Sequence, residues 1–324
     1  FDQLEQRLNV PNEVSIDPPQ AQLQPLINLY QQGQLQQTLD SAKLLVSQFP
    51  NSLTLYNIQG AANVRLGQLD AAIDIYKQAL KIKPDNAGVY NNIGIALKNK
   101  GDLEAAIVSY KKALKINPVY AEAYYNMGIA LQDKGDLKAA IKSYKQAIKI
   151  RPVYAEAFNN MGNALLDKGD LEAATDSFKK AINIKPDYAE AYYHMGIALK
   201  AKGDLEAAID SYKQAIKIKP DYAEAYFNMG NALYDKGDLE ASTDSCKQAL
   251  KINPDFAKVW HNLRFILQAM KKQVPAVDKL LSRLDLQTDS NYSQISKSIL
   301  SFSLHKGGKN AESALNKVCS LLSK

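Results

Sequence analysis

One spacing dominates this chain: a glycine and a proline each recur every 34 residues over most of its length. The glycines are Gly33, Gly67, Gly101, Gly135, Gly169, Gly203 and Gly237, and the prolines are Pro50, Pro84, Pro118, Pro152, Pro186, Pro220 and Pro254. Both residue types interrupt helices, so their recurrence indicates one copied supersecondary unit. A repeat of this size cannot bury its apolar face alone, which predicts a stacked array.

The repeat from Ala189 to Tyr222 carries two apolar stripes at helical spacing. Tyr192, Met195, Gly196 and Leu199 form the first stripe, and Ala208, Tyr212, Ala215 and Ile216 form the second. This pattern predicts two helices in each repeat, which we call the first and the second helix.

Specific residues mark where these helices begin and end. Gly203 can adopt the left-handed conformation that ends the first helix, and Asp204 can cap the second. Pro220 then stops the second helix. Asp221 and Glu224 have the spacing of a capping box, which predicts that Asp221 caps the next first helix.

Landmark residues in the repeat resemble those of a known family. In Ala87 to Tyr120 they are Tyr90, Ile93, Gly94, Leu97, Ala106, Tyr110, Ala113 and Pro118. This pattern resembles the tetratricopeptide repeat. The resemblance implies an all-α, right-handed α-solenoid (superhelix), with first helices lining its concave face. The pattern decays at both ends, which predicts degenerate hairpins that cap the array.

The regularity of the pattern predicts three regions. Residues 1–18 form an N-terminal lead-in segment with a short helix at Asp2 to Leu8, residues 19–256 form seven repeats, and residues 257–324 form a degenerate repeat and C-terminal capping helices. The last hairpin is expected to turn at Gly307 and Gly308. In the middle, Val119–Pro152 resembles Asp187–Pro220 more closely than its immediate neighbour, which indicates duplication two repeats at a time.

Composition and motifs argue against several functional classes. The net charge of +6 comes almost wholly from lysine, whereas nucleic-acid binding proteins usually use more arginine. Cys246 and Cys319, like the three histidines, are too scattered for a disulfide framework, a metal site or a cofactor site. No catalytic motif is present, which predicts a protein that is not an enzyme.

Two features bear on the cellular location. No apolar run is long enough to span a bilayer, so no transmembrane segment is expected. Sparse cysteine and the lack of a leader sequence favour the cytoplasm.

A column of amides is the strongest surface signal. At one position of successive first helices stand Asn92, Asn126, Asn160, His194, Asn228 and Asn262, which we call the amide ladder. Asparagine is a mediocre helix former, and its amide can hold the backbone of an extended peptide. The ladder resembles the asparagine ladder in the repeat superhelix of O-GlcNAc transferase. The alternative is that these amides bond to each other between repeats and stiffen the stack.

Beside the ladder lie residues that could contact the same partner. They are Tyr125, Tyr193 and Phe227 at the preceding position, and Asn163 and Asn231 one turn further along the helix. Aromatic groups among amides suit a partner with apolar anchors and an exposed backbone. The alternative is that Tyr125 and Tyr193 pack between repeats.

The second helices carry lysine pairs at i and i+4, for example Lys145 with Lys149 and Lys213 with Lys217. Asp74, Asp210 and Asp244 can each neutralise one lysine at i+3. We interpret this side as a solvated face, the alternative being a surface for an acidic partner or a membrane.

Together these features predict a non-catalytic scaffold that binds an extended or helical protein segment in its concave groove. Two alternatives remain open. The chain could be the recruitment domain of a larger glycosyltransferase or sulfotransferase, or it could self-associate end to end.

Overall fold

The computed structural model describes residues 16–259, 261–263 and 266 of the chain. The helices of this part are α2 (Gln20–Gln31), α3 (Leu35–Gln48), α4 (Leu53–Arg65), α5 (Leu69–Ile82), α6 (Ala87–Lys100), α7 (Leu103–Ile116), α8 (Ala121–Asp133), α9 (Leu137–Ile150), α10 (Ala155–Asp167), α11 (Leu171–Ile184), α12 (Ala189–Ala201), α13 (Leu205–Ile218), α14 (Ala223–Lys236) and α15 (Leu239–Ile252). The helix expected at Asp2 to Leu8, the turn at Gly307 and Gly308, and nearly all of the expected capping region lie outside the described residues.

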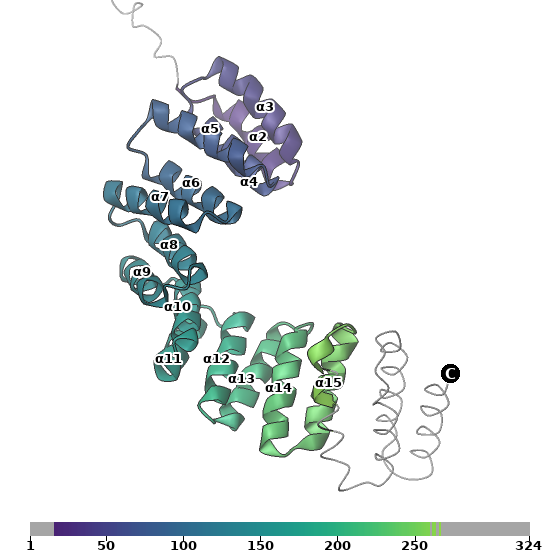
Figure 1. Ribbon diagram of the computed structural model, residues 1–324. Coiled ribbons are helices and arrows are strands. Elements are labelled where there is room, and N and C mark those ends of the chain that lie inside the picture. The colour runs from purple at the N-terminus through teal and green to yellow at the C-terminus, as the bar shows by residue number, and fades with distance from the viewer. Residues whose placement is uncertain (1–15, 260, 264–265, 267–324) are drawn as a thin grey trace, which may run out of the picture. The chain divides into compact units, whose positions relative to one another are not determined.

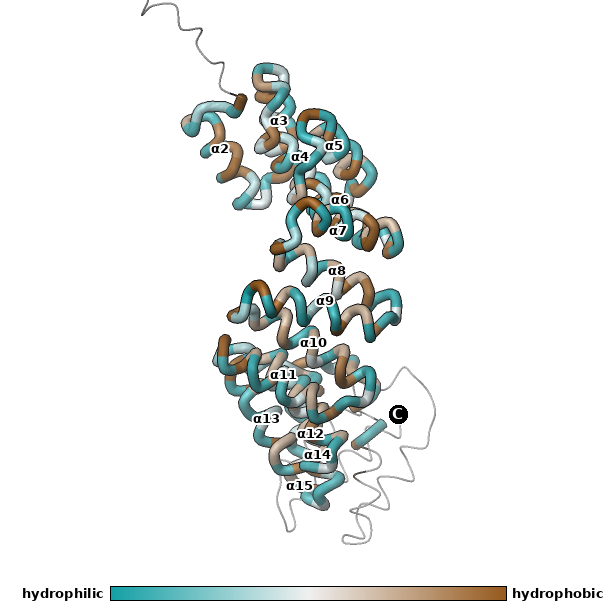
Figure 2. Tube along the Cα trace, turned by 90° about the vertical axis from the view of Figure 1, so that its left-hand side faces the viewer, coloured by the Kyte–Doolittle hydropathy of each residue, from teal (hydrophilic) through white to brown (hydrophobic). Residues whose placement is uncertain are grey.

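The chain divides into two compact units, residues 1–164 and 165–324, and the division falls inside α10. Within each unit the helices form antiparallel pairs that follow one another in chain order (Figure 1). Apolar and polar residues are interspersed along the helices, as expected for helices that bury one side (Figure 2).

Helix packing repeats from pair to pair. A first helix packs on the second helix of its own pair, as α6 does on α7 and α12 on α13. The second helix then packs on the next first helix, as α7 does on α8 and α13 on α14. The expected all-α architecture of stacked helix pairs is therefore confirmed within each unit.

The recurring glycines end the first helices. All seven have positive φ, for example 90° at Gly101 and 88° at Gly237, where an L side chain would be strained. Gly101 and Gly237 are the left-handed C-caps of α6 and α14. The prediction that glycine terminates the first helix is therefore confirmed.

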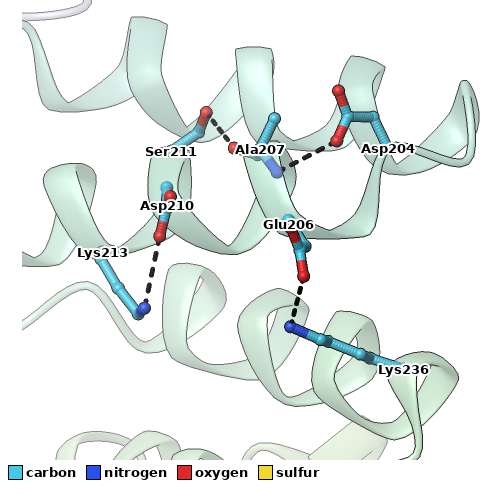
Figure 3. Close-up of polar contacts among 7 residues, drawn as sticks. All are labelled: Asp204, Glu206, Ala207, Asp210, Ser211, Lys213 and Lys236. Atoms are coloured by element: carbon cyan, nitrogen blue, oxygen red, sulfur yellow. Dashed lines mark hydrogen bonds and ion pairs between the residues drawn. The ribbon is translucent and has the colours of Figure 1, made fainter.

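The aspartate after the turn glycine caps the second helix. The Asp204 side chain accepts a hydrogen bond from the backbone N–H of Ala207 at 3.2 Å, at the start of α13 (Figure 3). Asp102, Asp136, Asp170 and Asp238 make the equivalent bond. This confirms the predicted cap.

The capping box predicted at Asp221 and Glu224 is wrong. The N-cap of α14 is Tyr222, and no side chain bonds to the exposed N–H groups there. The helix begins one residue later than the pattern suggested, so Glu224 is the second residue of the helix and cannot close the box. In α4 and α6 the same position holds Ser52 and Asn86, which do cap.

A glycine and a tyrosine interlock at the centre of most repeats. A Cβ placed on Gly94 would lie 2.5 Å from the ring of Tyr110, and one placed on Gly196 would lie 2.5 Å from the ring of Tyr212. Both tyrosines are fully buried. Only glycine allows the ring to lie against the backbone of the first helix, so this pair fixes how closely the two helices approach.

Candidate interaction surface on the first helices

Successive first helices contact one another as well as their own partners. In the N-terminal unit α4 contacts α6 and α6 contacts α8, and in the C-terminal unit α12 contacts α14. Because first helices lie close enough to touch, the residues between them form a continuous strip across neighbouring repeats.

The amide ladder is hydrogen-bonded along this strip. Asn126 donates from Nδ2 to Oδ1 of Asn91 at 3.0 Å, and Asn92 donates to Oδ1 of Asn57 at 3.5 Å. In each case the acceptor lies 35 residues earlier, at the position just before the ladder in the preceding repeat. The ladder therefore ties each first helix to the one before it.

Tyrosine replaces the amide as acceptor in every second repeat. Asn160 donates to the hydroxyl oxygen of Tyr125 at 3.1 Å, and Asn228 donates to that of Tyr193 at 3.0 Å. Asn262 donates instead to the side chain of Asn231. The ladder asparagines therefore bond between adjacent repeats, as the alternative interpretation predicted.

These bonds leave part of each amide unused. A side-chain amide has two N–H donors and a carbonyl that can accept two bonds. The bonds to Asn91 and Tyr193 use one N–H each of Asn126 and Asn228, and both amides are only partly buried. Their carbonyl oxygens take no part in these bonds, whereas that of Asn160 accepts a bond from Asn159 at 3.3 Å.

The aromatic residues beside the amide ladder pack between repeats, although part of their surface stays exposed. The ring of Tyr125 lies 4.9 Å from that of Tyr154, between ring centroids, and Tyr193 lies 4.9 Å from Tyr222. Phe227 lies 5.2 Å from Phe256. Each pair joins a first helix to the turn before the next one, so these rings stabilise the stack.

The surroundings of Tyr125 and Tyr193, the two tyrosines beside the ladder, keep their hydroxyls neutral. Burial raises the pKa of Tyr125, and the negative charge of Glu156 adds to this rise, while the hydrogen bond from Asn160 opposes it. Burial likewise raises the pKa of Tyr193, with Glu224 adding to the rise and Asn228 opposing it. These hydroxyls therefore stay protonated near neutral pH.

His194 occupies the ladder position in α12. Its ring lies 5.2 Å from Tyr193 and 5.9 Å from Phe178, between centroids. Burial lowers the pKa of His194, and the charges of Glu190 and Asp167 oppose this shift only in part. His194 is therefore a neutral ring in an aromatic cluster, and it continues the ladder without adding charge.

The remaining predicted residues are partly buried on the same helices. Asn163 lies on α10 and Asn231 on α14, where isoleucine stands in α6, α8 and α12. Asn231 serves as the acceptor for Asn262, a bond that links it to the ladder. The amide pattern indicated bonds between repeats as an alternative, but it did not identify the acceptors. For Asn92, Asn126, Asn160 and Asn228 the acceptor lies 35 positions earlier, one residue more than the repeat length.

Two properties of the described residues bear on other functions. In the part of the chain that the structure covers, no cluster of three or more histidine, cysteine, aspartate or glutamate side chains could hold a metal ion. None of the helices described is both long and apolar enough to cross a bilayer.

Models of the tetratricopeptide repeat match most of the regular part of the chain. The matches cover residues 60–101, 96–135, 130–169, 162–203, 198–237 and 223–256. These models describe a repeat module and indicate no catalytic family. Among curated proteins, no sequence similar to the chain was found.

Several solved structures are similar to parts of the chain. MamA is 34% identical to the chain over 51% of it and 97% of that protein, with a TM-score of 0.49. YrrB, described as a TPR protein with an unusual peptide-binding site, is 24% identical, over 58% of the chain and 96% of YrrB, with a TM-score of 0.50. The C-terminal part of a TPR repeat-containing protein from Cytophaga hutchinsonii is 20% identical over 74% and 98%, with a TM-score of 0.57.

Proposed function

Because the chain belongs to the tetratricopeptide repeat family, whose members act as protein-interaction modules, we propose that it is a non-catalytic scaffold that binds an extended or helical protein segment across its first helices. The amide ladder, with Tyr125, Tyr193, Phe227, Asn163 and Asn231 beside it, is the proposed binding surface.

The observation that carries this proposal is the half-used state of the ladder amides. One N–H of Asn126 and one of Asn228 donate to the preceding repeat, which fixes the orientation of each amide plane. A fixed amide loses little conformational entropy when it binds, so its second N–H and its carbonyl are preorganised for a peptide backbone. The stiffening bonds and peptide binding are thus compatible roles of one side chain.

The surroundings of the ladder suit such a partner. Partly exposed Tyr125, Tyr193 and Phe227 offer apolar surface beside the amides, and Glu156 and Glu224 are exposed at the first turns of α10 and α14. The partner segment should therefore combine apolar side chains with basic ones. YrrB, described as a TPR protein with a peptide-binding site, supports a peptide segment as the partner.

A pair of double variants tests the proposal. Tyr125→Phe with Tyr193→Phe removes only the acceptors of the stiffening bonds, whereas Asn160→Ala with Asn228→Ala removes those bonds and the amides themselves. Peptides selected on the wild-type protein from a random library would then be titrated against both variants by calorimetry.

We expect both variants to lose similar stability. The asparagine variant should lose peptide affinity by about tenfold or more for two lost backbone contacts, and the tyrosine variant should lose much less, because it keeps the amides and gives up only their preorganisation. Equal affinities in the two variants would mean that the ladder only stiffens the stack.

A further inference from the structure

Two second helices of this chain differ only in charge. α9 and α13 each have 14 residues, and their sequences agree except at two positions, where α9 has Lys138 and Lys142 and α13 has Glu206 and Asp210. α9 therefore carries four lysines and no acidic residue, whereas α13 carries two lysines and two acidic residues.

The acidic residues of α13 are engaged with lysines. Glu206 pairs with Lys236 of α14 at 2.9 Å, and Asp210 pairs with Lys213 at 3.3 Å (Figure 3). Asp74 and Asp244 pair with the equivalent lysines of α5 and α15. In α5, α13 and α15, an aspartate therefore neutralises the lysine three residues after it.

The lysines of α9 lack such partners. Lys138, Lys142, Lys145 and Lys149 are all exposed, and none takes part in an ion pair in the described part of the chain. Their spacing of i, i+4, i+7 and i+11 places them on one face of the helix. Like charges at this spacing repel, so the row is unfavourable for the isolated protein and needs another explanation.

The second helix of the preceding repeat has one acidic residue where α13 has two: Glu104, which pairs with Lys134 at 3.0 Å. On α7, Val108 stands at the position of Asp74 and Asp210, and it is 52% exposed beside Lys111 and Lys115. The turns that follow α7 and α9 hold Val119 and Val153, which are 70% and 73% exposed. The corresponding turns of the C-terminal unit hold Asp187 and Asp221. The chain therefore carries exposed aliphatic groups in the segments just before and just after the basic row.

The chemistry of this surface favours one kind of partner. Neither α7 nor α9 contains arginine, the residue that suits paired hydrogen bonds to nucleic-acid phosphates and to individual carboxylates, and their tyrosines, Tyr110 and Tyr144, are fully buried and cannot stack on bases. The same face of a second copy would be repelled, because it carries the same lysines. Lysine needs no fixed geometry, so clustered lysines with adjacent aliphatic groups fit a diffuse anionic plane.

We propose that the outer face of α7 and α9, with Val119 and Val153, docks on an anionic lipid surface. This surface lies on the second helices, so it can act together with a protein segment bound to the first helices. Attraction comes from the lysines, and the valines enter the interfacial region of the bilayer.

The test uses the full chain and sedimentation with vesicles of phosphatidylcholine, with or without about 30% phosphatidylserine. Lys138→Glu with Lys142→Asp gives α9 the sequence of α13, which already folds in this protein. We expect wild type to bind only the anionic vesicles, and this variant to bind them roughly thirtyfold more weakly.

A charge-swapped variant controls for net charge. Adding Glu206→Lys and Asp210→Lys to the first variant restores the net charge but moves the basic row to α13, which lacks the valines. We expect this variant to bind as weakly as the first one, within about threefold, because the lysines must lie on α9 near the exposed valines. Val119→Asp with Val153→Asp should also weaken binding of the wild-type protein.

Two results would overturn the proposal. Wild type could fail to bind the anionic vesicles, or the charge-swapped variant could bind as tightly as wild type, which would reduce the effect to overall charge. Binding of polyglutamate or duplex DNA by wild type, without vesicle binding, would assign the face to an acidic polypeptide or a nucleic acid instead.

Discussion

The repeat made of α12 and α13 and the repeat made of α14 and α15 have similar helices but differently filled centres. In the first, Tyr212 lies against Gly196, and in the second Cys246 takes the place of the tyrosine opposite Gly230. Ser242 of α15 then donates to the backbone oxygen of Gly230 at 2.7 Å. In the last regular repeat a serine side chain of the second helix thus bonds to the backbone of the first helix, whereas in the other repeat a tyrosine ring lies against that backbone. The same repeat pattern therefore tolerates two ways of joining its helices.

The largest expected effect comes from adding one methyl group to each glycine. Gly196→Ala places a Cβ 2.5 Å from the buried Tyr212 ring, so the helices must move apart, at a cost of about 1–3 kcal/mol in the free energy of unfolding. In Gly230→Ala the nearest atom is Sγ of Cys246 at 3.1 Å, and the helix propensity of alanine offsets part of the strain, by about 1 kcal/mol. Denaturant titrations followed by circular dichroism would compare the two variants. Equal losses would show that the ring does not set the helix spacing.

A smaller effect is expected from the hydroxyl of the central tyrosine. Tyr144 donates to Oε1 of Gln132 at 3.0 Å, whereas the buried hydroxyl of Tyr110 has no partner in the described part of the chain. Tyr144→Phe should lower the free energy of unfolding by about 1 kcal/mol, and Tyr110→Phe should leave it unchanged or raise it. Phe178 already occupies this position in α11. Thermal unfolding of both variants would reveal the difference, and a loss in Tyr110→Phe as large as in Tyr144→Phe would contradict it.

The helix caps are a feature in which the two compared repeats agree. Asp204 and Asp238 accept bonds from Ala207 and Ala241 at 3.2 and 3.0 Å. Changing either aspartate to alanine should cost about 1 kcal/mol, and the two losses should match. Unequal losses in urea titrations would mean that α13 and α15 differ in more than their packing.

The smallest effect concerns the ladder position, where α12 has His194 and α14 has Asn228. Burial lowers the pKa of His194, so the unfolded chain binds a proton more readily than the folded one. Stability should therefore fall as the pH drops below the ordinary histidine pKa of about 6.5, until the folded protein is protonated as well. His194→Asn should flatten this dependence, as measured by unfolding between neutral and mildly acidic pH. A wild-type stability that does not change there would refute the assignment.

Much of the fold could be predicted because glycine, proline and aspartate act locally. Gly101 ends its helix through its own backbone conformation, and Asp204 caps through a bond three residues away, so a single repeat contains the information. The cap at Asp221 was predicted wrongly because the neighbouring Tyr222 takes that place, and it contributes a ring to the stack with Tyr193 instead of a hydrogen bond.

The candidate site was less predictable, since its bonds join repeats. The residue types of the amide ladder were evident, but the direction of the Asn160 amide depends on the Tyr125 hydroxyl of another helix. The contrast between α9 and α13 was visible in the letters alone, at Lys138 and Lys142. Its significance became clear only from the ion pairs of Glu206 and Asp210 in α13, because α9 has no acidic residues to form such pairs.

The offset of 35 residues between Asn228 and its acceptor has a consequence for how such genes change in length. Recombination that inserts or excises one whole repeat brings each ladder side chain opposite the residue one copy further away. That residue is again an amide or an aromatic group, and an amide or a tyrosine would still accept the bond. The number of repeats can therefore change during evolution while most hydrogen bonds between adjacent repeats are kept. Selection can thus lengthen or shorten the scaffold without new contacts between its repeats.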